Sequence, residues 1–456
     1  MSEKKLTRRE MLKVSGALAA TAVLASCAPK ATVAPTAAPT AVPEVKPVAG
    51  VVTIMHQRNE LSEDQQKQFE TDNPGITMNF VTADQTRFFA MYAAGTPPDL
   101  YRCQAPSIPQ FLARKLLYDL TPYFEASQLT KLDDLAAAND YYKADSPLSI
   151  GKGKIYGMCK DFSPDFTVFI YTKLFNDASV PVPDDTKALT YAEVMDIAKK
   201  TTKMEGDRIL SLGYGYADGW IDRIWMAMLL ETGQKLYTDG FDQIVLSAND
   251  EAKKIVQYYL DLANQKVTPS PINPSPNGWF GTDYNAGILA MAQYGFWFSA
   301  MAETDTNRGG CMMLPAPTWS GQRRDCTMTA TGMIMTSATK VPDAAWKVFE
   351  WYNGGQPSID RAKSGWGVPA LKSQMSMIPQ GTDFQKQVYK VLQGELALGT
   401  PPIQFNPFVG ETVVSDSWLK NLDIVLKGDN KVETLMANIE AEVNLSIKEA
   451  IDRIMG

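Results

Sequence analysis

The sequence predicts an α/β fold with doubly wound sheets flanked by helices. The first observation is that short apolar segments of strand length alternate with helical segments from residue 51 onward, which is the pattern of parallel strand–helix–strand units. The second is the composition, with 45% hydrophobic and 21% charged residues among 456. A chain of this length with an ordinary globular composition can form the hydrophobic cores of more than one domain.

The first strand–helix units lie within residues 51–101. Strands are expected at 51–55, 76–81 and 99–101, with helices at 61–72 and 87–94. Ligands of such sheets bind beyond the carboxyl ends of the strands. The residues that follow the first and third strands are therefore candidate ligand contacts, with solvated loop residues as the alternative: Gln57, Arg58, Asn59, Arg102 and Gln104.

Four later segments carry clear helix signals. Thr190 and Glu193 form a capping box at the start of one helix. Residues 251–266 place apolar side chains on one helical stripe. Pro342 opens a helix that stops at an Asn-Gly-Gly sequence. Residues 432–455 read as one amphipathic helix or two.

The N-terminal segment, residues 1–26, reads as an export signal. A basic head precedes an apolar stretch that is too short to span a bilayer. Arg8 and Arg9 resemble a twin-arginine signal, although signals of the general secretory route can also contain two arginines. The Leu-Ala-Ser-Cys sequence at 24–27 resembles a bacterial lipobox. We therefore expect a lipid on Cys27, which would anchor the protein at the membrane.

Residues 27–50 predict a tether. After Cys27 the segment is rich in proline, alanine and threonine and has no aromatic residue, so it cannot bury enough surface to fold. If its residues are extended as polyproline, they reach roughly 70 Å. The folded part of the chain then begins near Val51.

Charge and residue usage argue against several classes of function. The formal net charge is −7 at pH 7, whereas nucleic-acid-binding proteins show a basic excess. The chain has one histidine, His56, and zinc sites draw on clusters of histidine and cysteine. The sequence contains no nucleophile elbow, metal motif or phosphate-binding glycine loop. We therefore expect no cofactor, no metal, no nucleic-acid partner and no enzymatic activity.

Short motifs follow one another along the whole of residues 51–456. They are FETDNPGIT at 69–77, AAGTPPDL at 93–100, GKIYG at 153–157, YTKLF at 171–175, LTYAE at 189–193, YGFW at 294–297, LPAP at 314–317 and VPDAAW at 341–346. Each is weak alone, but their order resembles that of bacterial extracellular solute-binding proteins of the first family, the maltose-binding-protein-like group.

The resemblance implies a two-lobed periplasmic-binding-protein fold of type II. Each lobe would be a doubly wound sheet flanked by helices, and crossover segments would act as the hinge. Lobe 1 would comprise residues 51–160 and 316–355. Lobe 2 would comprise residues 161–315 and 356–456, and the ligand would lie in the cleft between the lobes.

The resemblance also implies a function. The protein would be a monomeric, extracytoplasmic substrate-binding protein of an ABC importer, lipid-anchored to the cell membrane. It would capture a carbohydrate, either a mono- or an oligosaccharide, and deliver it to the membrane permease subunits when the lobes close. Polyols and glycerophosphodiesters stay open as ligands. Two alternatives are a secreted carbohydrate-active enzyme such as a glycosidase, and a surface sensing or adhesion lipoprotein of the same fold.

Indole rings are candidate platforms for the apolar face of a sugar, and burial of about 100 Å² of that face contributes roughly 2.5 kcal/mol. Trp297 matches a cleft position of the family, and Trp366 lies in a Gly-Trp-Gly loop that usually faces the cleft. Trp220 and Trp279 could belong to the cleft or to the core. Helical patterns predict that four further tryptophans are core residues: Trp225, Trp346, Trp351 and Trp418.

Two carboxylates, Asp161 and Asp165, flank the expected first crossover. The family often places a sugar-binding carboxylate here, and which of the two has this role stays open. Helix capping or a hinge salt bridge is the alternative for both. The preceding Met-Cys-Lys at 158–160 departs from the apolar residue and proline that relatives usually have.

The remaining cysteines are predicted to pair, because an extracytoplasmic compartment is oxidising. Cys311 would pair with Cys326, and Cys103 with Cys159. The first bridge would close a loop of about 15 residues and contribute roughly 3 kcal/mol in the chain-entropy model. Labelling of the folded, oxidised protein would then find no free thiol.

Overall fold

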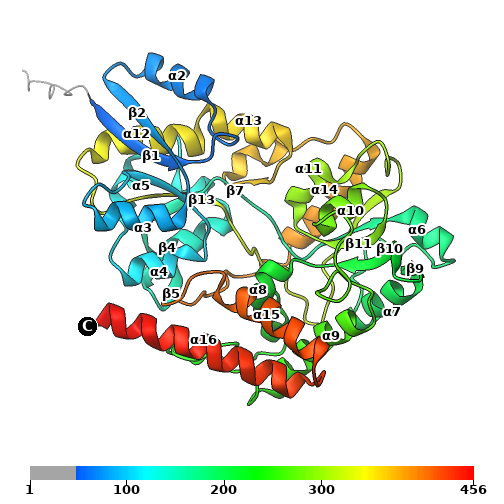
Figure 1. The fold of residues 1–456 in the computed structure, drawn as a ribbon. Coiled ribbons are helices and arrows are strands. Elements are labelled where there is room, and N and C mark those ends of the chain that lie inside the picture. The colour runs from blue at the N-terminus through cyan, green and yellow to red at the C-terminus, as the bar shows by residue number, and fades with distance from the viewer. Residues whose placement is uncertain (1–47, 456) are drawn as a thin grey trace, which may run out of the picture. The chain divides into compact units, whose positions relative to one another are not determined.

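The computed structural model describes residues 48–455, and these contain two five-stranded sheets, one in each of two lobes (Figure 1). The first sheet has the order β2-β1-β3-β13-β6. Its strands β1, β2 and β3 are parallel, as predicted, whereas β13 is antiparallel to both of its neighbours. The bounds are β1 (Gly50–His56), β2 (Ile76–Thr82), β3 (Leu100–Cys103), β6 (Gly157–Cys159) and β13 (Gly332–Met335).

The second sheet has the order β12-β8-β11-β10-β9. Strands β10 and β11 are parallel, and β8 runs antiparallel between β11 and β12. Both sheets are therefore mixed, because each takes up strands on which the chain enters or leaves a lobe. The bounds are β8 (Val168–Tyr171), β9 (Lys203–Glu205), β10 (Arg208–Gly215), β11 (Leu289–Gln293) and β12 (Cys311–Leu314).

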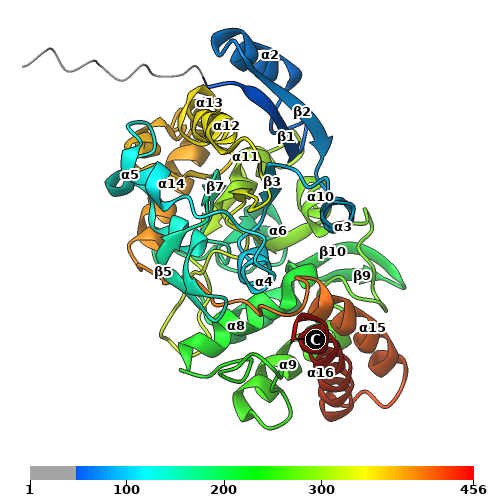
Figure 2. The same ribbon diagram turned by 90° about the vertical axis from the view of Figure 1, so that its left-hand side faces the viewer.

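Helices cover the first sheet on both faces. Figure 2 shows α12 and α13 on one side of β1 and β3 and α3 on the other. The elements of this lobe are α2 (Glu63–Asp72), α3 (Gln85–Ala93), α4 (Ser107–Ala113), α5 (Thr121–Ala126), α12 (Pro342–Gly354) and α13 (Gln356–Ser364), with the short helices η1 (Leu132–Asp134), η2 (Ala137–Tyr142) and η5 (Lys372–Met377) and the hairpin of β4 (Lys143–Ser146) and β5 (Ser149–Ile155).

The second lobe confirms the strongest helix predictions. The capping box at Thr190 opens α7, and the apolar stripe of α9 is buried. The bounds are α6 (Thr172–Asp177), α7 (Tyr191–Thr201), α8 (Ile221–Glu231), α9 (Asp250–Asn264), α10 (Phe280–Asn285), α11 (Ser299–Ala302), α14 (Asp383–Leu396), α15 (Val413–Lys427) and α16 (Val432–Met455), with η3 (Asp218–Trp220) and η4 (Phe296–Phe298).

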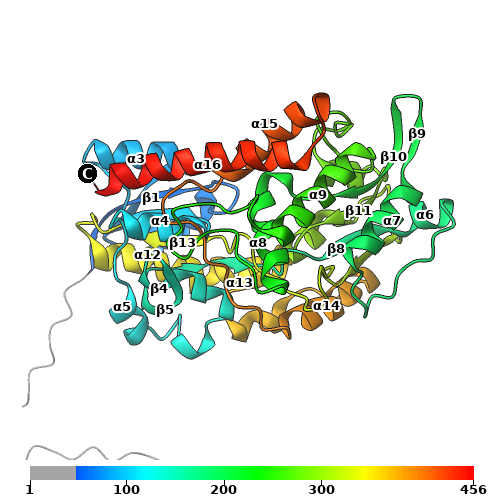
Figure 3. The ribbon, with the colours of Figure 1, turned by 90° about the horizontal axis from the view of Figure 1, so that it is seen from below.

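The C-terminal segment is one helix, α16. It packs against α15 and α9 of the second lobe, and seen from below it continues past the second lobe toward α3 (Figure 3). Within residues 48–455, none of the helices combines the length and apolar character needed to cross a membrane. The predicted signal at 1–26, the lipid on Cys27 and the tether at 27–50 lie outside the described residues, apart from the last three tether positions.

The chain passes between the lobes later than the expected boundary at 355/356. Ala136 donates its backbone N–H to the carbonyl of Ala370 (2.9 Å), and Ser373 donates to Asp134 Oδ1 (2.8 Å). These bonds hold residues 356–377 against the first lobe. Helix α14 packs on β12 of the second sheet, so the chain crosses between η5 and α14.

A further segment, residues 401–409, joins α14 to α15 along the first lobe. Ile403 donates its N–H to the hydroxyl of Tyr141 (3.0 Å), and Gln404 Oε1 accepts from the N–H of Ile150 (2.9 Å). The segment connects two helices of the second lobe and bonds to both lobes, because Asn406 Nδ2 donates to the carbonyl of Phe241 (2.9 Å) in the second lobe.

The structure contradicts both predicted disulfides, because Cys103, Cys159, Cys311 and Cys326 are buried free thiols. Cys103 and Cys159 pair with opposite sides of Gly332 in β13. A strand between them separates their Cα atoms by about 9–10 Å, beyond the roughly 4.4–6.8 Å that a disulfide spans.

The second predicted pair is separated along the chain that runs from Asp165 to Tyr171 at the end of β8. Cys311 pairs with Tyr171, whereas the carbonyl of Cys326 accepts from the N–H of Asp165. The two partner positions are six residues apart in largely extended chain, on the order of 15–20 Å. No bridge can form between these cysteines in this fold.

A thiol titration tests this correction. A chain beginning at residue 48, unfolded in denaturant without reductant, should present four reactive thiols. The native protein should react slowly, because its thiols are buried and burial raises the pKa of Cys311 to about 11. Recovery of two thiols or none from the unfolded chain would restore the disulfide prediction.

Candidate ligand-binding cleft

A pocket of about 310 Å³ lies between the two lobes. The first lobe contributes the ends of β1 and β3, and the second contributes the N-terminal end of α8. The loop before α15 closes it. Its polar and aromatic lining includes Gln57, Arg102, Gln104, Trp220, Arg223 and Glu411. Four of the sequence-predicted site residues therefore come together here.

Arg223 supports the second-lobe side of this pocket. Its guanidinium is buried, with Nη1 donating to the carbonyl of Met328 (2.8 Å) and Nη2 to Glu411 Oε2 (2.8 Å). The guanidinium carbon also lies 5.3 Å from the ring centre of Trp220, within the range of a cation–π contact. Trp220 therefore lines the pocket with one part of its ring while it also packs against the hydrophobic core.

Three other predicted residues form an aromatic arc with Tyr294. The ring centres of Trp279 and Tyr294 are 5.7 Å apart, those of Tyr294 and Trp297 are 5.0 Å apart, and those of Trp297 and Trp366 are 6.1 Å apart. The two ends of the arc are open, with Trp279 exposed by 37% and Trp366 by 43%. A row of aromatic rings that is exposed at both ends is typical of a binding surface.

The aromatic arc and the pocket are connected through the loop before α8. Burial and, to a smaller extent, the charge of nearby Asp218 raise the pKa of the Tyr294 phenol. Asp218 begins the η3 turn that ends at Trp220. Trp220 at the end of this turn lines the pocket.

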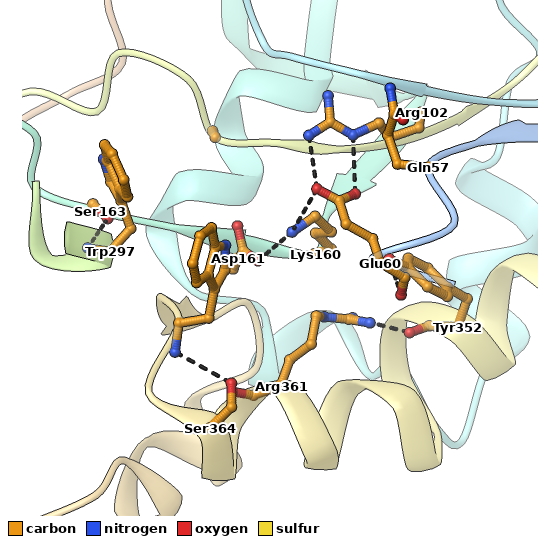
Figure 4. Close-up of polar contacts among 12 residues, drawn as sticks. Gln57, Glu60, Arg102, Lys160, Asp161, Ser163, Trp297, Tyr352, Arg361 and Ser364 are labelled. Atoms are coloured by element: carbon orange, nitrogen blue, oxygen red, sulfur yellow. Dashed lines mark hydrogen bonds and ion pairs between the residues drawn. The ribbon is translucent and has the colours of Figure 1, made fainter. Parts of the chain in front are cut away.

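An ion chain of alternating sign lies on the first-lobe side (Figure 4). Arg102 donates Nε and Nη2 to the two oxygens of Glu60 (2.9 and 2.8 Å). Lys160 Nζ lies 3.6 Å from Glu60 Oε1 and 2.5 Å from Asp161 Oδ2. The ion chain, defined as Arg102, Glu60, Lys160 and Asp161, carries no net charge.

Glu60 is the centre of this chain. Burial would raise the pKa of Glu60, but the charge of Lys160 and the hydrogen bonds and charge of Arg102 outweigh burial and lower it to about 2. Neighbouring His56 is buried, and burial lowers its pKa to about 3. Glu60 is therefore ionised and His56 neutral at physiological pH.

Asp161 and Asp165, which the sequence could not separate, lie in different surroundings. Asp161 is part of β7 (Asp161–Phe162), which pairs with β14 (Val368–Pro369) directly after the Trp366 loop. Asp165 is buried, and its Oδ2 accepts from the N–H of Met328 (2.6 Å). Asp161 is thus the carboxylate beside the aromatic arc, whereas Asp165 joins the two crossover segments.

Two predicted residues do not line the pocket. Arg58 lies with its guanidinium carbon 3.5 Å from the ring centre of Phe80 and donates to Gln66 Oε1 (2.9 Å), so it packs on the outer part of the lobe. Asn59 is an exposed loop residue. Gln57, by contrast, lines the pocket and donates to the carbonyl of Ala83 (3.3 Å).

The tryptophans predicted to be core residues follow the prediction closely. Trp225, Trp346 and Trp418 are buried, and Trp351 is partly buried, 4.8 Å between ring centres from Phe69. Their helical spacing in the sequence was sufficient to separate them from the aromatic arc.

The sequence did not reveal Glu60, Lys160, Arg223 and Glu411 as parts of the site. Glu60 is four residues beyond β1, and Lys160 stands in the Met-Cys-Lys departure from the family pattern. That departure was a usable signal, because a charged residue at a buried crossover needs a partner of opposite charge. Arg223 and Glu411 are 188 residues apart, and no local pattern connects them.

The raised pKa of the buried Asp165 can be tested by measuring stability as a function of pH. Burial raises the pKa of Asp165 to about 7, above its ordinary 3.8. The native protein therefore binds an extra proton between about pH 4 and 7, and its stability falls as pH rises through that window. Asp165→Asn should remove this slope, so its melting temperature should rise relative to wild type between pH 4 and 8.

The comparison with wild type cancels the opposite slope from His56, which both proteins share. Asp196→Asn on α7, a surface carboxylate with 68% of its side chain exposed, is the matched control and should follow wild type at every pH. A constant difference between Asp165→Asn and wild type across the range would contradict the raised pKa.

Solved structures of low sequence identity share this fold. An ABC substrate-binding protein from Listeria monocytogenes in complex with cycloalternan matches with a TM-score of 0.70 at 20% identity, over 87% of this chain and 99% of that one. A solute-binding protein from Agrobacterium vitis with bound D-mannitol matches with 0.67 at 16% identity, over 88% and 99%. The sugar-binding protein MalE from Xanthomonas citri matches with 0.66 at 15%, over 88% and 98%.

Sequence comparison gives a family but no individual relative. A search of curated proteins finds no match to this chain. The family model described as bacterial extracellular solute-binding protein matches residues 57–354, a range that includes the ion chain, Trp220 and most of the aromatic arc. This chain therefore belongs to the bacterial extracellular solute-binding protein family.

Proposed function

We propose that this protein is the substrate-binding component of an ABC importer and captures a carbohydrate between its lobes. The observation that carries the proposal is the aromatic arc with two exposed indole rings, set beside the pocket that both lobes line. A solute-binding protein has no chemical step to perform, so recognition by shape, stacking and hydrogen bonds accounts for its site.

The chemistry of the cleft suits a polar ring. The faces of Trp279, Trp297 and Trp366 can stack on C–H groups, and each face that buries about 100 Å² contributes roughly 2.5 kcal/mol. The amides of Gln57 and Gln104 can exchange hydrogen bonds with hydroxyl groups. Because the charges of the ion chain and of Arg223 with Glu411 neutralise one another, the cleft favours an uncharged ligand.

Structural relatives support the ligand class. Besides cycloalternan and D-mannitol, structures with this fold contain tagatose, maltose, lacto-N-biose, maltotriose and mannotriose. All are carbohydrates or sugar alcohols, and they differ in length from one ring or chain to several rings. The class is therefore proposed for this chain, with the individual sugar left to experiment.

Capture by closure needs two bodies and a hinge. We take the bodies to be residues 51–160 with 316–377, and residues 161–315 with 378–456, which moves the final boundary of the sequence prediction to the passage before α14. A ligand that touches both lobes binds the closed form more tightly, and only this difference in affinity can shift the open–closed equilibrium.

The N-terminal sequence supports a place outside the cytoplasmic membrane. Residues 1–26 would direct export by the twin-arginine or the general secretory route, a lipid on Cys27 would anchor the protein, and residues 27–50 would let the lobes reach the permease subunits. The protein would act as a monomer, because one cleft formed by one chain suffices for capture.

A sugar panel tests the function. Purified protein is heated with maltotriose, mannotriose, cycloalternan, lacto-N-biose, D-mannitol or tagatose, and the melting temperature is recorded. At least one member should raise it in proportion to the logarithm of ligand concentration above Kd, while chromatography shows the sugar unchanged. Hydrolysis would support a glycosidase instead, and no shift with any member would contradict a carbohydrate ligand.

Tryptophan variants test the placement of the cleft. Trp297→Ala and Trp366→Ala should each weaken binding of the tightest panel sugar by about 1–3 kcal/mol, because each removes a stacking face. Isothermal titration gives the affinities. Trp319→Ala is the control, since Trp319 is partly buried and donates Nε1 to Glu251 (3.1 Å) on α9 of the second lobe. Wild-type affinity in both cleft variants would show that the arc is not the binding surface.

A further inference from the structure

We propose that Lys160 is a positioning residue of the cleft, one that orients the carboxylate of Asp161 toward the ligand and connects it to the first lobe. The proposal rests on the proposed function, and it deepens that function by naming a residue that acts through another. It starts from one juxtaposition, the Lys160 ammonium between the carboxylates of Asp161 (2.5 Å) and Glu60 (3.6 Å).

Lys160 is buried to a degree that a lysine reaches only when it is paired. Its side chain is 2% exposed, and removal of an ammonium from water costs several kcal/mol unless opposite charges and hydrogen bonds compensate. The two carboxylates supply that compensation. Because the compensation needs both, Lys160 holds Glu60 and Asp161 in a fixed relation to each other.

The backbone of Lys160 is fixed independently of its side chain. Its N–H donates to the carbonyl of Thr331 (2.8 Å), one residue before β13. The residue stands between β6 and β7, where the chain leaves the first sheet. The ammonium is therefore carried by backbone that is hydrogen-bonded to the chain entering β13 of the first sheet.

The other end of the ion chain is also rigid. Arg102 binds both oxygens of Glu60 from β3, so Glu60 cannot turn away from Lys160 without breaking two charge-assisted hydrogen bonds. Glu60 and Arg102 come from the first lobe, and Asp161 comes from the crossover. The ion chain thus fixes the orientation of the Asp161 carboxylate, which lies beside the aromatic arc, relative to the first sheet.

Asp161 is the residue of the ion chain whose carboxylate can still accept a hydrogen bond from a ligand. One oxygen, Oδ2, is taken by Lys160. The pairing of Asp161 with Pro369 and the close approach of Gly367, whose added Cβ would lie 3.0 Å from that of Asp161, place the residue next to the Trp366 loop. A carboxylate oxygen at this point can accept a hydrogen bond from a sugar hydroxyl while the ring stacks on indole.

Other titratable and charged groups lie around Lys160 and Asp161. Asp165 is a buried carboxylate whose pKa is raised to about 7 by burial and, to a smaller extent, by the charge of Asp161. His56 on β1 is neutral and lies 3.9 Å from Glu60 through Nδ1. Cys159 on β6 is a buried thiol whose pKa burial raises. Tyr352 on α12 is a phenol whose pKa burial raises, and Arg361 on α13 lies over its ring at 4.4 Å. His56, Cys159 and Tyr352 carry no positive charge, and the Arg361 guanidinium donates Nη2 to the carbonyl of Tyr352 (3.0 Å).

The test is a set of four proteins: wild type, Lys160→Met, Asp161→Asn and the double variant. Affinity for the panel sugar that wild type binds most tightly is measured between pH 5 and 8, with melting temperature as the check on folding. Lys160→Met should bind about 10- to 100-fold more weakly, the loss expected for a charge-assisted hydrogen bond. The double variant should be within about threefold of Asp161→Asn, because both changes interrupt one interaction.

Two readouts separate positioning from a purely structural role. The pH profile is read as affinity relative to wild type, so that the titration of Asp165, which both proteins share, cancels. This ratio should fall toward pH 5 for Lys160→Met, because two adjacent carboxylates without an ammonium take up a proton. Lys160→Arg retains the charge and should keep a flat profile with affinity within about fivefold of wild type. Lys154→Met at an exposed pair on β5 is the matched control.

The outcomes are distinct. If losses from Lys160→Met and Asp161→Asn multiply in the double variant, or if Lys160→Met keeps a flat pH profile, the positioning role is wrong while the proposed function stands. If Lys160→Met does not fold, the affinity of Lys160→Arg is measured instead, with and without Asp161→Asn. In that case, a pH profile of Lys160→Arg that is no longer flat overturns the proposal. If wild type binds no panel sugar, the carbohydrate function fails and this inference fails with it.

Discussion

The first sheet is completed by a strand that arrives from the second lobe. Strand β13 lies between β3 and β6, and Gly332 forms pairs with Cys103 on one side and Cys159 on the other. A Cβ at Gly332 would lie 2.2 Å from the carbonyl of Met158, so no larger residue fits without a shift of the backbone. This insertion joins the outgoing and returning crossovers in one sheet.

Several features of the site follow from this insertion. Thr331 accepts the backbone N–H of Lys160, and Met328 donates to Asp165 while accepting from Arg223. Residues on the returning chain thus fix charged groups from the outgoing crossover and from α8. The same insertion separates Cys103 from Cys159, so the junction is held by strand pairing and buried polar contacts instead of a covalent bridge.

The charged groups of the cleft form two clusters in which every charge has a partner of opposite sign. Arg102, Glu60, Lys160 and Asp161 neutralise one another, and Arg223 does so with Glu411. Buried charges are tolerated only when such partners are present, and removal of one member leaves the other uncompensated. The aromatic arc supplies apolar area next to these charged groups.

The sequence by itself determined the features that depend on neighbours along the chain. The periodicity of residues 251–266 and the capping box at Thr190 predicted α9 and α7, and the strand–helix alternation predicted the parallel β1, β2 and β3. Helical spacing also separated core tryptophans such as Trp225 and Trp418 from those of the arc. These predictions succeed because hydrogen bonding and burial within one element follow a fixed period.

Only the tertiary structure decided which distant residues meet. Glu60 and Lys160, 100 residues apart, and Arg223 and Glu411, 188 residues apart, become partners through chain crossings that no local period records. The same holds for the cysteines, whose predicted pairing failed because β13 and the chain from Asp165 to Tyr171 intervene. Asp161 and Asp165 look alike in the sequence, and only the tertiary structure shows that Asp161 accepts from Lys160 while Asp165 is buried and accepts from the returning chain at Met328.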